Sequence, residues 1–160
     1  MNDLIKIIKY RLLWLNILLI ALFTFFSFFV FEVSAFLFVL LSNLFDILGY
    51  HFTLIRRTKE IPDKIIVKSY RVNQFLFDVL LLLLIGIQFD WISSFAGWIM
   101  KLFGLQDVFY YLFLNEKLPE KWNWMKWTPL GLFKGTLTKN EIVIQSIIGI
   151  LIAVIILILR

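Results

Sequence analysis

Three aspartates lie inside apolar stretches, where carboxylates are rare. They are Asp46, Asp78 and Asp107, and the last belongs to "FGLQDVFYYLFL" at residues 103–114. An Asp at the centre of a membrane helix costs about 2.5 to 3.5 kcal/mol on insertion scales, so three such residues indicate a use. Together they could hold a hard divalent cation such as Mg²⁺, divide general acid and base roles, or carry protons.

Other polar side chains follow the aspartates at helical spacing. Residues three and four apart share one face of a helix, so each acid belongs to a polar stripe. The stripes are Asn43 with Asp46 and Tyr50, Arg71 with Gln74 and Asp78, and Asp107 with Tyr110 and Tyr111. If the stripes face a common interior, they form one polar cavity.

The candidate roles follow from these residue types. As catalytic groups we predict the three aspartates and His51. The predicted substrate-binding groups are Asn43, Tyr50, Arg71, Gln74, Lys101, Tyr110 and Tyr111. Lys101 has a second interpretation, in which it neutralises a buried acid such as Asp46. His51 could instead lie with its ring at the level of the lipid head groups.

Several kinds of site are excluded. The chain has no cysteine, which rules out disulfides and iron–sulfur clusters. His51 is its only histidine, so bis-histidine haem sites and multi-histidine metal sites cannot form. The formal charge of +5 does not indicate nucleic-acid binding, because the basic residues flank apolar runs. The sequence leaves the cofactor open, with a divalent cation at the three aspartates as the candidate.

Composition determines the fold class. With 61% hydrophobic residues and 18 phenylalanines in 160 residues, the chain has more apolar surface than one soluble domain buries. A membrane helix needs about 20 apolar residues. We therefore predict a single all-α integral membrane domain of about five transmembrane helices covering 1–160. The expected spans are 12–31, 35–55, 72–88, 91–114 and 142–159, with loops at 56–71 and 115–140.

The positive-inside rule predicts the orientation. The amino-terminal segment and the two loops carry fourteen of the sixteen Lys and Arg residues, which places the amino terminus inside and the carboxyl terminus outside. At a rise of 1.5 Å per residue the three aspartates lie roughly 9 to 14 Å from the inner surface. The predicted cavity therefore opens to the cytoplasm. A prokaryotic plasma membrane is the expected location.

Three functions fit this pattern. The favoured one is an enzyme that acts on a lipid or isoprenoid in the inner leaflet. A proton-coupled transporter of a small solute or ion is the second. In the third, the chain is a non-catalytic subunit or assembly factor that docks through its last span, which contains the small residue Gly149. The expected partners are membrane lipids and either further copies of the chain or another membrane subunit. The segment "KWNWMKW" (121–127) fits an interfacial belt or, alternatively, a lid over the cavity.

Overall fold

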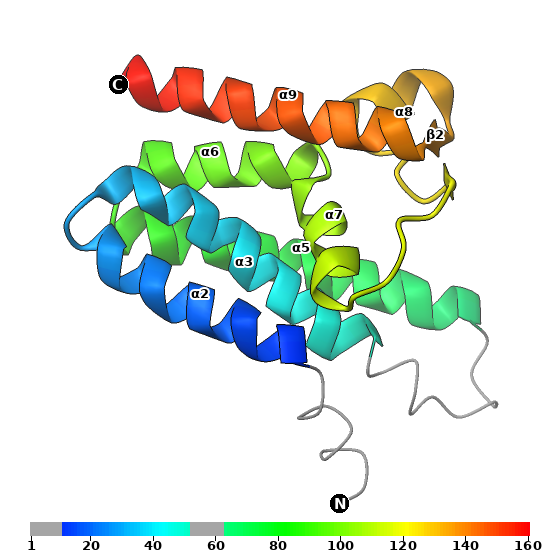
Figure 1. Cartoon of the computed structure of the whole chain (residues 1–160), viewed down its shortest axis with the longest axis horizontal. Coiled ribbons are helices and arrows are strands. Elements are labelled where there is room, and N and C mark those ends of the chain that lie inside the picture. The colour runs from blue at the N-terminus through cyan, green and yellow to red at the C-terminus, as the bar shows by residue number, and fades with distance from the viewer. Residues whose placement is uncertain (1–10, 52–62) are drawn as a thin grey trace, which may run out of the picture.

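Long helices run back and forth along one axis in the computed structural model, which describes residues 11–51 and 63–160 (Figure 1). The helical elements are α2 (Arg11–Ser27), η1 (Phe31–Val33), α3 (Ser34–Asp46), the π-helix η2 (Ile47–His51), α5 (Asp63–Gln88), α6 (Trp91–Leu102), α7 (Leu105–Phe113), α8 (Pro129–Lys134) and α9 (Lys139–Ile158). Two short strands, β1 (Lys121–Trp122) and β2 (Leu137–Thr138), pair antiparallel.

Three helical segments are long and apolar enough to cross a membrane within the described ranges. They are Phe31–Gly49, Lys68–Gln88 and Lys139–Ile158, and α2 adds a shorter apolar stretch, Leu12–Ser27. Large apolar side chains are exposed along these helices, among them Phe25, Phe75, Ile87 and Ile158. Exposed apolar surface of this extent fits a membrane location.

The helices share two ends. At the turn end lie the reversal 28–33, the turn at Phe89–Asp90 and the carboxyl-terminal Arg160 (Figure 1). At the loop end lie η2, the start of α5, α7 and residues 115–138. Arg160 forms ion pairs at the turn end with Glu32, at 3.4 Å, and with Asp90, at 3.1 Å. Arg160, which follows α9, therefore joins the two tight reversals through their acidic residues, Glu32 and Asp90.

Small residues bring α6 to the centre of the bundle, where it packs against α3, α5 and α9. Its buried face contains Ser93, Ser94, Ala96 and Gly97. A Cβ on Gly97 would lie 2.5 Å from the carbonyl oxygen of Ala35 on α3, so only glycine allows this approach. The Asp90 carboxylate accepts hydrogen bonds from the backbone N–H and hydroxyl of Ser93 and so caps the N-terminus of α6.

The apolar run 91–114 does not form one helix. The chain breaks between α6 and α7 at Phe103 and Gly104, and Gly104 has φ of +89°, a conformation that glycine adopts readily. Gln145 of α9 donates to the carbonyl oxygen of Phe103 at 3.1 Å and accepts from the N–H of Leu130 at 2.8 Å. One side chain of α9 therefore hydrogen-bonds both to the carbonyl at the helix break and to the first turn of α8, which links the two.

The 115–138 segment folds into a packed cap at the loop end. Its Trp122, Met125 and Leu137 form a cluster with Ile142 of α9, and all four side chains are fully buried. The Trp122 indole donates to the carbonyl oxygen of Pro119 at 2.7 Å, and the Thr128 hydroxyl caps α8. A capping box between Thr138 and Glu141 begins α9. This packing gives the exposed tryptophans of the segment fixed positions.

Candidate functional site

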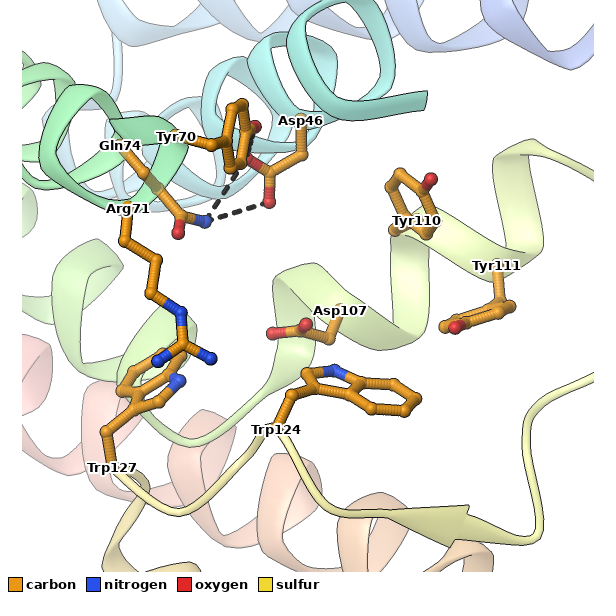
Figure 2. A pocket seen from close by; sticks show the side chains of 9 residues that line it. All are labelled: Asp46, Tyr70, Arg71, Gln74, Asp107, Tyr110, Tyr111, Trp124 and Trp127. Carbon is orange, nitrogen blue, oxygen red and sulfur yellow. Dashed lines mark hydrogen bonds between the residues drawn. The ribbon is translucent and has the colours of Figure 1, made fainter. Parts of the chain in front are cut away.

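A polar cavity of about 350 Å³ lies at the loop end of the bundle (Figure 2). Side chains from α3, α5, α7 and the 115–138 segment surround it. The lining residues are Asp46, Tyr70, Arg71, Gln74, Asp107, Tyr110, Tyr111, Trp124 and Trp127. Six of the residues proposed from the sequence stripes therefore meet in one place: Asp46, Arg71, Gln74, Asp107, Tyr110 and Tyr111.

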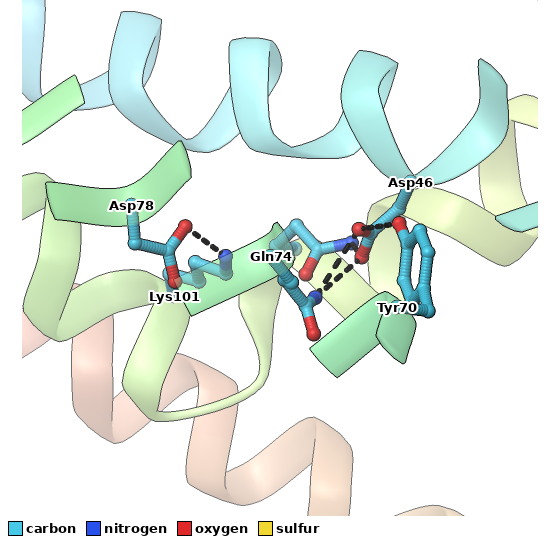
Figure 3. Close-up of polar contacts among 6 residues, drawn as sticks. Asp46, Tyr70, Gln74, Asp78 and Lys101 are labelled. Atoms are coloured by element: carbon cyan, nitrogen blue, oxygen red, sulfur yellow. Dashed lines mark hydrogen bonds and ion pairs between the residues drawn. The ribbon is translucent and has the colours of Figure 1, made fainter. Parts of the chain in front are cut away.

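Asp46 is held by three neutral donors. The hydroxyl of Tyr70 donates to its Oδ1, and the amide of Gln74 donates to both oxygens, at 3.2 and 3.0 Å. Gln106 of α7 donates to Oδ2 at 2.6 Å (Figure 3 shows this network). Hydrogen bonds to an ionised group contribute about 1.5 to 3 kcal/mol each, so this network fixes the carboxylate and joins α3, α5 and α7.

Asp107 has a different environment. Its carboxylate points into the cavity toward Arg71, with Trp124 beside it (Figure 2). A carboxylate has lone-pair sites for about four donors, so Asp107 keeps capacity for a ligand. Arg71 is exposed at the cavity and presents a planar guanidinium that can bind a carboxylate or phosphate.

Aromatic side chains form the rest of the wall. Tyr110 and Tyr111 pack edge to face, with ring centroids 5.4 Å apart, and Tyr111 contacts buried Trp122 in the same way at 5.2 Å. Trp124 in turn lies 5.1 Å from the ring of Trp122. The aromatic side of the cavity is therefore anchored to the core of the cap. The lid interpretation of "KWNWMKW" gains support because Trp124 and Trp127 both line the cavity.

Asp78 and Lys101 form an ion pair away from this lining (Figure 3). Both side chains are largely buried, with exposures of 15% and 4%. The neutralising interpretation of Lys101 is confirmed, but its partner is Asp78 of α5 and not Asp46. The pair argues against the expectation that Asp78 and Lys101 contact a substrate, because each side chain is already paired with the other.

The three aspartates do not gather into a metal site. Within residues 11–51 and 63–160, no three His, Cys, Asp or Glu side chains come close enough to hold a metal ion. The described residues therefore give no support to the three-carboxylate cation site suggested by the sequence. The physical reason is that Lys101 on the adjacent α6 neutralises Asp78, while Asp46 and Asp107 face the cavity from opposite helices.

Asn43 is fully buried and does not line the cavity. Neither of its amide atoms has a hydrogen-bond partner among the described residues, and the same holds for Asn16 of α2. A substrate-binding role for Asn43 through this cavity is therefore not supported. The backbone of Tyr50 and His51 belongs to η2, but the predicted roles of both side chains fall outside what the structure describes. Of the predicted 56–71 loop, residues 56–62 also lie outside the described residues, and residues 63–71 are helical, as the first part of α5.

Sequence reasoning missed two groups that hold Asp46. Tyr70 lies four residues before Gln74 and eight before Asp78, so the same helical spacing could have identified it. Gln106 gave no such signal, because its role depends on the break that reorients α7. Gly149, which suggested a docking helix, is occupied within the chain: a Cβ there would lie 2.4 Å from the Cβ of Phe103.

Comparison of the chain with protein-family models, curated proteins and solved structures finds no match.

Proposed function

We propose that the protein is a membrane enzyme that acts on the polar head of a lipid or isoprenoid at the cytoplasmic surface. The observation that carries this proposal is the cavity in which Asp107, Arg71 and an aromatic wall meet at one end of an apolar bundle. Pockets of 300 to 1,000 Å³ with a few convergent polar groups are typical of small-molecule sites.

The proposed topology has five crossings, made by α2, α3 with η2, α5, α6 with α7, and α9. Two features support it. The helices alternate in direction. Within the described ranges the turn end has only three charged residues, which are Glu32 and Asp90 in the reversals and Arg160 after α9. The basic loops lie at the opposite end. By the positive-inside rule the loop end, and with it the polar cavity, faces the cytoplasm.

The chemistry assigned to the cavity is acid–base catalysis by Asp107. Asp46 is saturated by Tyr70, Gln74 and Gln106, so Asp107 is the carboxylate in the lining that can accept a proton from a substrate hydroxyl. Arg71 would bind an anionic group of the same substrate. Trp124, Trp127 and the tyrosines would exclude water from the reacting atoms.

The test compares lipid extracts from a bacterial host that produces the wild type, Asp107→Asn or Glu116→Gln. Glu116 is an exposed acid outside the cavity and serves as the matched control. Mass spectrometry should show a lipid class altered by the wild type and by Glu116→Gln, and unaltered by Asp107→Asn. Equal melting temperatures of the three purified proteins would exclude misfolding. Identical lipid profiles from all three hosts and from a host without the protein would contradict the enzyme proposal.

Proton-coupled transport is the second candidate, and the buried Asp78–Lys101 pair favours it. Ionisable pairs within membrane helices frequently belong to proton pathways. An enzyme of the proposed kind should keep its activity when the pair is replaced by Asp78→Asn with Lys101→Met. A transporter should lose flux driven by a pH gradient in proteoliposomes containing the same double variant.

A further inference from the structure

A second cavity, of about 400 Å³, lies along the side of the bundle where α2, α3 and α7 meet. We call it the apolar groove. Every residue lining it is apolar: Leu12, Leu15, Leu19, Phe23, Phe36, Leu40, Phe109, Leu112 and Phe113. The four α2 residues are spaced three or four apart, so they form one stripe about 16 Å long. The groove therefore runs parallel to the helices.

Helix α7 separates the apolar groove from the polar cavity. Asp107, Tyr110 and Tyr111 project from one face of α7 into the polar cavity, whereas Phe109, Leu112 and Phe113 line the groove. Tyr110 belongs to both surroundings. It lines the polar cavity and also packs against the apolar cluster that includes Leu40 and Phe113. The side chain of Tyr110 therefore lies between the polar cavity and the apolar groove.

The lining of the groove identifies its occupant. The nine lining residues present no polar surface over a length of about 16 Å. A peptide in extended form or a polar solute would leave its hydrogen-bonding groups unsatisfied against this lining. A single hydrocarbon chain has no such groups.

The surroundings of the groove agree with this choice. Leu15 and Leu112, which line it, are 41% and 59% exposed. In the proposed topology this side of the bundle contacts lipid, and the groove runs in the direction of the lipid chains from the cytoplasmic end inward. A chain in it would have its polar end next to α7.

We infer that the substrate is an amphiphile with one long hydrocarbon chain, fatty acyl or isoprenyl, held in the groove between α2, α3 and α7 while its head enters the polar cavity past Tyr110. This inference rests on the proposed function and adds to it the site that binds the substrate's single hydrocarbon chain. Tyr110 then positions the junction between chain and head. The groove would discriminate against substrates that lack a chain.

Photolabelling tests the chain site directly. The protein is reconstituted in phosphatidylcholine nanodiscs that contain a small fraction of a fatty acid with a diazirine at the chain end. After irradiation, adducts are mapped by mass spectrometry with and without excess unlabelled oleic acid. Adducts on the groove residues Leu15, Leu19 and Leu112 should decrease with the competitor. Adducts on exposed Leu83 of α5 and Ile148 of α9 report nonspecific lipid contact and should not decrease.

A pair of variants gives a second measurement. Leu19→Trp fills the groove and should reduce its adducts, whereas Leu83→Trp on exposed α5 should leave them unchanged. Equal labelling of groove, α5 and α9, or groove labelling that oleic acid does not reduce, would overturn the inference. Labelling does not require turnover, so its failure is separable from that of the enzyme proposal. Saturable groove labelling in a protein that alters no lipid would retain the chain site and overturn the catalytic role.

Discussion

The side-chain amide of Gln145 donates to the carbonyl oxygen of Phe103, 42 residues earlier, at 3.1 Å. This contact joins α9 to the break between α6 and α7, and that break sets the direction in which Asp107 points. The same side chain accepts from the N–H of Leu130. The position of the catalytic candidate therefore depends on a residue of the last helix.

Gln145→Leu should destabilise the protein by about 1 to 3 kcal/mol, because it leaves the Leu130 N–H without its partner and the Phe103 carbonyl with only the Ser146 hydroxyl, at 3.4 Å. Thermal unfolding in detergent measures the effect. Gln88→Leu, an exposed position at the end of α5, is the matched control and should change the melting temperature little. Equal melting temperatures of the two variants would show that the break is held by other contacts.

Gly97→Ala should lower the free energy of unfolding by about 1 to 3 kcal/mol, the usual range for overpacking. The added Cβ would meet the Ala35 carbonyl oxygen at 2.5 Å and the Phe38 Cβ at 2.6 Å, and neither can move without shifting α3. Ala21→Leu on the exposed face of α2 adds more bulk and should have little effect. If chemical denaturation finds the two variants equally stable, α3 and α6 are less tightly packed than described.

Lys101→Met should cost about 3 to 5 kcal/mol, because it leaves Asp78 buried without its partner. Replacing both residues, as Asp78→Leu with Lys101→Met, should recover most of the loss, since well-packed apolar residues often substitute for a buried ion pair. A double-mutant cycle on melting temperature provides the comparison. Additive losses in the double variant would argue against direct coupling of the two side chains.

The proposed orientation can be tested by single cysteines, because the chain has none of its own. Glu116→Cys at the loop end should react with an impermeant maleimide only from the cytoplasmic side. Phe29→Cys at the turn end is 71% exposed in the wild type and should react from outside. Reaction of both variants from the same side would overturn the five-crossing topology and the cytoplasmic position of the cavity.

The sequence predicted much of the polar cavity because two simple rules determine it. Helical spacing placed Asp107, Tyr110 and Tyr111 on one face, and similar depth brought that face near Asp46 and Gln74. The same spacing put Asp78 on the Gln74 stripe, one turn further along. Lys101 on the adjacent α6 then pairs with Asp78, and such a contact between helices cannot be derived from either helix alone.

The remaining features depend on contacts between distant residues. The helix break at Gly104 exposes the carbonyl of Phe103, which accepts a hydrogen bond from Gln145. The sequence near Gly104 therefore cannot by itself predict how the break is stabilised. The cap similarly depends on pairing of Trp122 with Leu137 across a strand pair of two residues each. In the sequence the break appears only as part of an apolar run, and the cap only as a polar loop. Hydropathy therefore predicts neither structure.

The aromatic wall has a practical consequence. Trp124 and Trp127 border the polar cavity, so a molecule that enters it will change the polarity around two indole rings. Ligand binding should therefore change the intrinsic tryptophan fluorescence. Comparison with Trp124→Phe would identify the part of this change that comes from Trp124 and not from the buried Trp122. Ligands can be screened by intrinsic fluorescence before any reaction has been identified.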